Sequence, residues 1–111
     1  MNLIPLIFDV TDSLPPEISG GGRLHIAAWL FLPPDLSVLG ASPVAMALLP
    51  GGSYSKRYFH LQFPGYSGYS AAEYLAAQGN IVLLLDHLGV GDSTKAADQK
   101  LATRQIVALA N

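Results

Sequence analysis

The stretch Ile81–Ser93 reads IVLLLDHLGVGDS, and the rest of the chain is organised around it. Five consecutive apolar residues follow a Gly-Asn break and run into an aspartate and two glycines. A short apolar run with these boundaries is typical of a strand buried on both faces, as in a parallel sheet covered by helices. After Asp86 the chain must turn sharply, and Gly89 and Gly91 supply the backbone freedom for that turn. Ligands of open α/β sheets bind at such strand ends, so we expect a site here.

The composition indicates one small domain that forms part of a larger structure. The 111 residues suffice for a single domain. Half of them are hydrophobic and only 13% are charged, against about 25% in an average soluble domain. Since small domains have much surface per unit volume, more charged residues would be expected of a complete one. We therefore expect residues 1–111 to form a single, incomplete domain.

Charge and residue usage exclude several classes of function. The net charge of −2 provides no basic face for nucleic acid. The absence of cysteine excludes disulfides, thiolate metal sites and a cysteine nucleophile, and the three histidines lack the spacing of metal ligands. There is no signal-peptide pattern and no apolar run of about 18 residues that would span a membrane. We expect a cytoplasmic protein without a cofactor, and its oligomeric state stays open.

Alternation and turn residues predict three strands before the helical half of the chain. The expected strands are Leu6–Asp12, Arg23–Leu32 and Val44–Leu49. The glycine-rich loop between the first two indicates an antiparallel pair, with the first strand at a sheet edge. The third strand ends in Pro-Gly-Gly-Ser-Tyr, a loop in which the backbone can approach a ligand closely.

Two helices are predicted around the central strand. Ser70 followed by Glu73 is a capping box, and Gly79 stands where a helix would end. The apolar stripe of this helix is Ala72, Leu75 and Ala76, and that of the last helix is Ala102, Ile106, Leu109 and Ala110. The alternation of strand and helix predicts the α/β class: an antiparallel hairpin, then a mostly parallel sheet with helices flanking it.

Two loops, taken with their spacing, resemble a known family. Leu49–Tyr54 reads LPGGSY, and some thirty residues later Asp86–Ser93 reads DHLGVGDS. This resembles the N-terminal portion of α/β-hydrolase-fold serine enzymes of esterase or lipase type. That family has a His-Gly or Pro-Gly-Gly loop after its third strand and Asp-x-x-Gly-x-Gly-x-Ser after its fourth. The resemblance implies a partial α/β-hydrolase sheet covering nearly the whole chain.

The resemblance also implies roles for individual residues. The loop containing Gly51, Gly52 and Ser53 would provide a backbone N–H to the oxyanion hole, which stabilises the negative oxygen of acyl transfer by about 3 kcal/mol. Pro50 replaces the more common histidine. The residues implied to build the second turn are Asp86, Gly89, Gly91 and Ser93. Tyr54 and His87 are candidates for substrate contact because of their place at the presumed cleft.

The catalytic residues themselves are expected to be absent. In this family the Gly-x-Ser-x-Gly nucleophile elbow follows the fifth strand, and the acid and histidine come later. We expect the chain to stop before that elbow, so it would contribute the oxyanion loop but have no activity alone. The expected substrate of the complete protein is a small ester or related acyl compound. The alternative is a non-catalytic α/β binding or interaction module.

Other candidate motifs have simpler interpretations. The segment Gly65–Tyr69 resembles the elbow but lacks its second glycine and follows no strand, so we expect a loop. Ser93 has no histidine after it and is expected to cap the turn. His25 is expected to pack within a strand and His60 to be exposed in a loop. Five aromatic residues have two interpretations, lining an acyl pocket or packing among themselves: Tyr54, Tyr58, Phe59, Phe63 and Tyr66.

Nucleotide binding is the rival class, and its motifs are incomplete. Gly89-Val90-Gly91 after a strand is similar to a dinucleotide fingerprint, but Thr94 stands where the third small residue belongs. The segment also follows the fourth predicted strand, whereas that fingerprint follows the first.

Overall fold

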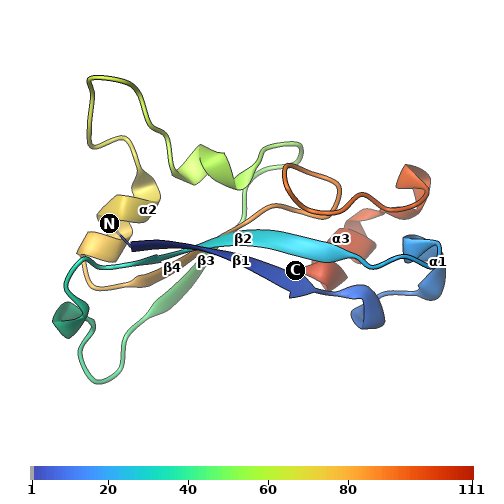
Figure 1. Cartoon of the computed structure of the whole chain (residues 1–111), viewed down its shortest axis with the longest axis horizontal. Helices are drawn as coiled ribbons and strands as arrows, with labels where there is room; N and C mark the ends of the chain where they lie inside the picture. The colour runs from blue at the N-terminus through green and yellow to red at the C-terminus, as the bar shows by residue number, and fades with distance from the viewer. Residues whose placement is uncertain (1) are drawn as a thin grey trace.

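Four strands form one mixed sheet in the computed structural model, which describes residues 2–111. They are β1 (Asn2–Asp9), β2 (His25–Leu32), β3 (Ala45–Leu48) and β4 (Ile81–Leu85). Their order across the sheet is β1-β2-β4-β3, so β2 and β4 occupy the interior positions (Figure 1). The long loop before the second α-helix projects away from the sheet.

The predicted fold class, a mostly parallel sheet flanked by helices, is wrong. β1 pairs with β2 and β2 pairs with β4 in antiparallel fashion, and only β3 and β4 run parallel. The expected antiparallel pairing of the first two strands is confirmed. However, β2 also pairs with β4 in antiparallel fashion, so the sheet is mixed. The physical reason is that β2 carries apolar residues on both faces. Phe31 and Ala28, which point to opposite faces, are both buried, so this strand gains most from an interior position.

Three short α-helices accompany the sheet: α1 (Pro16–Ser19), α2 (Ala71–Ala77) and α3 (Arg104–Ala110). They have four to seven residues each, too short to be stable without packing. In Figure 1, α2 lies near one end of the sheet and α1 and α3 near the other. The helices α1 and α3 contribute Ile18 and Ala110 to one hydrophobic cluster, and α2 contributes Ala72 and Ala76 to a second.

The two clusters use alternate residues of the central strands. Leu85 of β4 belongs to the first cluster with Ile26 and Ala28 of β2, whereas Val82 and Leu84 belong to the second with Phe31. Because successive residues of a strand face opposite sides, both faces of the sheet's middle are covered. The prediction that Ile81–Leu85 is a buried strand is confirmed, including its boundaries.

Differences from the other predicted elements are local. β1 begins at Asn2, earlier than expected, and ends at Asp9. The helix α1 forms in a segment that was predicted to be only a turn, with Pro16 in the first helical position, where its missing N–H costs nothing. In α3, Leu109 is exposed although the predicted stripe included it.

Candidate functional site

The loops that follow β3 and β4 lie together because the two strands are parallel neighbours. Their carboxyl ends therefore reach the same edge of the sheet. A hydrogen bond of 2.7 Å joins His87 Nε2 to the carbonyl oxygen of Pro50. The amide nitrogen of Asn111 donates to His87 Nδ1 at 2.9 Å, which places the ring proton on Nε2 and makes His87 the donor to Pro50. The two loops of the family resemblance are thus joined directly.

The loop after β3 contains a tight turn with free donors. Tyr54 N donates to the carbonyl oxygen of Gly51 at 3.0 Å, and Ser53 has φ of 71°. This geometry matches a type II turn, whose third residue requires positive φ. Ser53 is the one non-glycine residue in residues 2–111 with positive φ. Within the same residues, the N–H groups of Gly52 and Ser53 donate to no protein acceptor. The turn therefore presents two backbone donors that are available to a ligand.

These donors border a mostly apolar hollow of about 560 Å³. Its polar and charged lining residues are Gly52, Ser53, His87, Arg104 and Asn111, and its apolar ones include Leu49, Leu88, Val90, Val107 and Ala108. Pockets that hold small molecules have this character, with apolar walls and a few polar groups that fix orientation. An acyl chain could lie against the walls while an oxygen meets the N–H groups.

The turn after β4 is built on the carboxylate of Asp86, which is fully buried. Its Oδ1 accepts from Lys56 N at 2.7 Å, and its Oδ2 accepts from Lys56 Nζ at 2.7 Å and from Asp92 N at 2.9 Å. The side chain thus ties the 3-10 helix at Lys56–Phe59 to both ends of the turn. These contacts make the carboxylate a structural part of the turn.

Ser93 and the two glycines complete this turn. Ser93 Oγ donates to the carbonyl oxygen of Asp86 at 2.8 Å and accepts from Ala27 N at 2.9 Å, so the side chain links the turn to β2. Gly89 and Gly91 have φ of 86° and 56°. A Cβ at Gly91 would overlap the Asp86 carboxylate, so only glycine fits there.

Lys56 was not identified from the sequence, although it is central to this region. Its side chain is buried and bonds to Asp86 at 2.7 Å and to Asp92 at 2.8 Å. The ammonium also lies 4.5 Å from the centre of the Trp29 ring, a cation–π distance. The hydrogen bond from Lys56, together with its charge, lowers the pKa of Asp92 below its ordinary value. The arrangement neutralises a buried charge, which is the condition for burying it at all.

The remaining predicted site residues lie elsewhere. Tyr54 stacks on Tyr58, with ring centres 5.5 Å apart, and does not line the hollow beside His87. His25 bonds to Thr94 Oγ1 and to the carbonyl oxygen of Asp92, so it belongs to the support of the turn. The expectation that His60 is exposed is wrong: its side chain is 9% exposed, because it packs against Trp29 and Phe31.

Within residues 2–111, neither Ser53 nor Ser93 is paired with a histidine base. Ser70, which bonds to His60 Nδ1 at 2.7 Å, is buried as the N-cap of α2. Ser93 Oγ is buried and committed to two backbone groups. Both nitrogens of His87 are occupied, so this ring does not activate the nearby Ser53. Ser67 lies in the projecting loop, as predicted for the elbow-like segment. The described residues also contain no group of three side chains suited to hold a metal ion.

Comparison with known proteins adds no family to this description. None of the helices among the described residues is long and apolar enough to cross a bilayer. The sequence matches no family model, and no curated protein was found to be similar to it.

Proposed function

We propose that this chain supplies the oxyanion loop of an acyl-transfer site, as the N-terminal portion of a serine hydrolase of esterase or lipase type. One observation carries the proposal. The turn at Gly51–Tyr54 presents two backbone N–H groups without protein acceptors, at the border of an apolar hollow and beside the end of β4. The sequence resemblance implied this role for the same loop, and the proximity of the two loops supports it.

The chemistry of such a loop is electrostatic. When a nucleophile attacks an ester carbonyl, the oxygen becomes negative, and fixed N–H donors stabilise that charge without reorganising. Positive φ at Ser53 costs about 1–2 kcal/mol for a non-glycine residue, and the turn keeps it while leaving the donors free. Strain of this kind is common where a backbone group must be aimed at a ligand. The hollow beside the donors suits an acyl group of moderate size.

The nucleophile, base and acid must come from residues outside the described ones. The proposal therefore expects no ester hydrolysis by the 111-residue chain. An assay with p-nitrophenyl acetate tests this part. Turnover by the purified chain that Ser93→Ala abolishes would contradict it, because Ser93 is here a structural residue of the turn.

The donor role itself is tested with a matched pair of variants at Gly52. Proline is favoured at the second position of a type II turn, so Gly52→Pro keeps the turn while removing the N–H. Gly52→Ala keeps the N–H, and there is open space for its Cβ. Butanoate serves as the probe, since its carboxylate oxygen carries the negative charge and its propyl tail fits an apolar wall.

We expect butanoate to shift the amide resonances of Gly52 and Ser53 saturably in NMR titrations of the wild-type chain and of Gly52→Ala. Gly52→Pro should bind about tenfold more weakly, because a hydrogen bond to a charged group contributes about 1.5 kcal/mol or more. Equal affinities of the two variants, or shifts confined to other amides, would favour the alternative of a non-catalytic binding module.

A further inference from the structure

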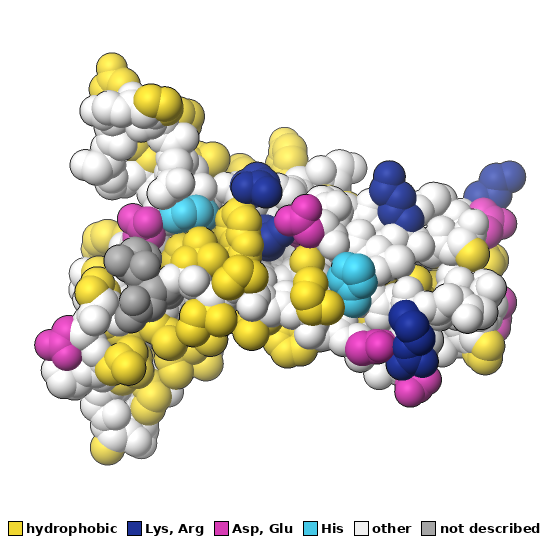
Figure 2. Space-filling view, viewed as in Figure 1, with side chains coloured by type: hydrophobic (Ala, Val, Ile, Leu, Met, Phe, Trp, Pro, Cys, Tyr) yellow, Lys and Arg dark blue, Asp and Glu magenta, His cyan; other side chains and the backbone are white. Residues whose placement is uncertain are grey.

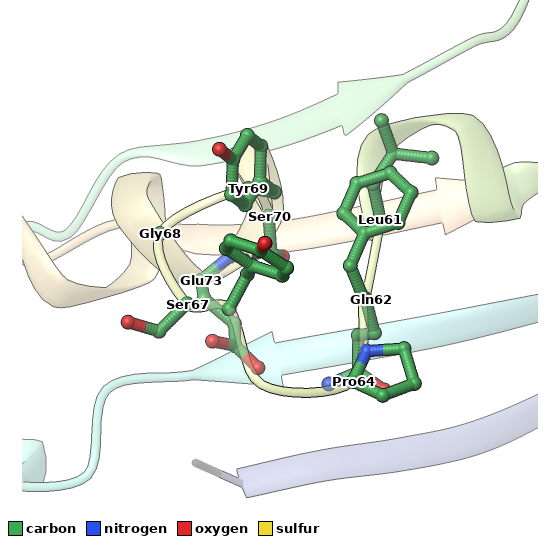
Figure 3. A pocket seen from close by; sticks show the side chains of 10 residues that line it. Leu61, Gln62, Pro64, Ser67, Gly68, Tyr69, Ser70 and Glu73 are labelled. Atoms are coloured by element: carbon green, nitrogen blue, oxygen red, sulfur yellow. Dashed lines mark hydrogen bonds between the residues drawn. The ribbon is translucent and has the colours of Figure 1, made fainter.

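A second hollow, in the projecting loop, is walled by aromatic side chains and does not belong to the site above. Its volume is about 450 Å³, and the residues lining it run from Leu61 to Glu73. Figure 3 shows Leu61, Gln62 and Pro64 along one limb of the loop and Ser67, Gly68 and Tyr69 along the other, with the hollow between them. A separate, smaller hollow of about 250 Å³ is lined by three of the same residues, Phe63, Tyr66 and Tyr69.

The ring of Tyr69 stands nearly perpendicular to the rings of both Phe63 and Tyr66. The planes of Phe63 and Tyr69 meet at 88° with centres 5.3 Å apart, and those of Tyr66 and Tyr69 meet at 82° with centres 6.5 Å apart. They cover one another incompletely, since Phe63, Tyr66 and Tyr69 remain 47%, 72% and 54% exposed. Contacts within the loop therefore bury only part of the three rings, and their remaining aromatic surface is accessible to a ligand.

Local backbone structure holds the main chain of two of these aromatic residues in place before any ligand arrives. Tyr66 N donates to the carbonyl oxygen of Phe63 at 3.0 Å, and the same two residues form a β-bridge. The turn between them is Pro64-Gly65, with φ of 80° at Gly65, which is the pattern of a type II turn. Proline and glycine suit these two positions, so the turn is preorganised. A site that is preorganised binds with less loss of conformational entropy.

The carboxylate and the aromatic rings that line this hollow favour a cationic ligand. Glu73 is the one ionisable acid or base among its lining residues other than the tyrosines. Its carboxylate pairs with no lysine or arginine within residues 2–111, and it lies 3.9 Å from Nδ1 of the His60 ring. Aromatic faces carry negative potential, and quaternary ammonium groups are recognised by sets of such faces. An adjacent carboxylate adds to the same potential.

We propose that the hollow walled by Phe63, Tyr66 and Tyr69 binds a small molecule that carries a quaternary ammonium group. The trimethylammonium head contacts perpendicular rings at once because it is nearly spherical, and Glu73 offsets its charge. The volume lies within the range of small-molecule pockets, which favours a free small molecule over a polypeptide or a membrane surface. The site is independent of the oxyanion loop.

The test measures binding of choline to the full 111-residue chain by NMR titration. Its control ligand is 3,3-dimethyl-1-butanol, which has the same shape without the charge. We expect choline to bind and the neutral alcohol to bind at least about tenfold more weakly, since the ring faces and Glu73 act on charge. Equal binding of the two compounds would overturn the proposal, and so would association with phosphatidylcholine vesicles without binding of free choline.

Substitutions at Tyr66 distinguish the electrostatic contribution of an aromatic ring face to choline binding from the contribution of apolar surface alone. Tyr66→Phe should retain choline affinity, whereas Tyr66→Leu should lose about threefold or more, as expected for one cation–π contact. Glu73→Gln should also weaken binding. Tyr74→Ala is the matched control, because Tyr74 is an exposed tyrosine of α2 that does not line the hollow. Since Tyr66 is largely exposed, its variants should fold normally. A Tyr66→Leu variant that binds choline as well as the wild type would overturn the proposal.

Discussion

The Asp86 carboxylate shows how one buried side chain can hold a turn in place. Both of its oxygens face hydrogen-bond donors, namely the N–H groups of Lys56 and Asp92 and the ammonium of Lys56. In Asp86→Asn, one oxygen becomes an NH₂ group that faces donors. We expect a loss of about 3–5 kcal/mol in the free energy of unfolding, as when one partner of a buried ion pair is removed. Urea denaturation followed by circular dichroism measures it.

Asp92→Asn provides the matched comparison, since Asp92 bonds to the same ammonium at 2.8 Å but has a 61% exposed side chain. Water screens an exposed pair, so this change should cost no more than about 1 kcal/mol. Both variants remove one carboxylate charge beside Lys56, so the difference between their free energies of unfolding measures the effect of burial. If Asp92→Asn destabilised the protein as much as Asp86→Asn, the buried carboxylate would not be the organising group of the turn.

At the scale of single residues, the sequence predicts the groups that act locally and misses those that act across the chain. Gly91, Asp86 and Ser93 follow from the demands of a tight turn at a strand end, and in the structure all three belong to that turn. Lys56 precedes Asp86 by 30 residues and stands in an aromatic-rich loop, so no local pattern marks it as buried. His60 was assigned to the surface for the same reason, because its partners Trp29 and Phe31 belong to β2.

Among the elements, α2 has only seven residues and a buried N-cap, so we expect it to depend strongly on that cap. Ser70 Oγ accepts from Glu73 N at 3.1 Å and bonds to His60 Nδ1 at 2.7 Å, and the residue is buried. Ser70→Ala removes both bonds and leaves the His60 nitrogen without this partner. We expect a loss of about 2 kcal/mol in the free energy of unfolding, the upper end of the range for an N-cap.

Thr103→Ala is the control for this prediction, since Thr103 caps α3 by a longer bond of 3.4 Å to Ile106 N and is exposed. It should cost about 0.5 kcal/mol, the low end of the same range. Thermal or urea denaturation of the two variants compares them directly. Equal losses would mean that the bond to His60 adds nothing to the cap.

Elements with strong local signals were predictable, whereas their arrangement was not. Breaks on both sides of Ile81–Leu85 define β4, and the capping box defines the start of α2. The mixed sheet was missed because alternating strands and helices were taken to imply parallel neighbours throughout. Which strand lies beside β4 is decided by tertiary burial, and β2 wins that position through its two apolar faces. The two loops nonetheless meet as expected, since this requires only that β3 and β4 be parallel neighbours.

For the molecule as a whole, the two outer strands of the sheet differ in how they are protected. β1 contains Pro5, which cannot donate to another strand and so blunts that edge. β3 has the sequence Ala-Met-Ala-Leu, with neither charge nor proline, and within residues 2–111 it pairs only with β4. Val44 and Leu49 beside it are exposed. Figure 2 shows a broad hydrophobic area over one half of the molecule.

An uncharged edge strand with apolar neighbours invites pairing with another chain. We therefore expect the 111-residue protein to self-associate as its concentration rises, through the free edge of β3. Ala47→Lys places a charge on that edge at an exposed position and should shift the protein toward monomer. Ala77→Lys adds the same charge at an exposed position of α2 and should leave association unchanged. Sedimentation velocity over a concentration series measures both. A wild-type chain that stays monomeric, with sharp and dispersed NMR signals, would show that the β3 edge is not a pairing surface, and equal effects of the two lysines would place the contact elsewhere.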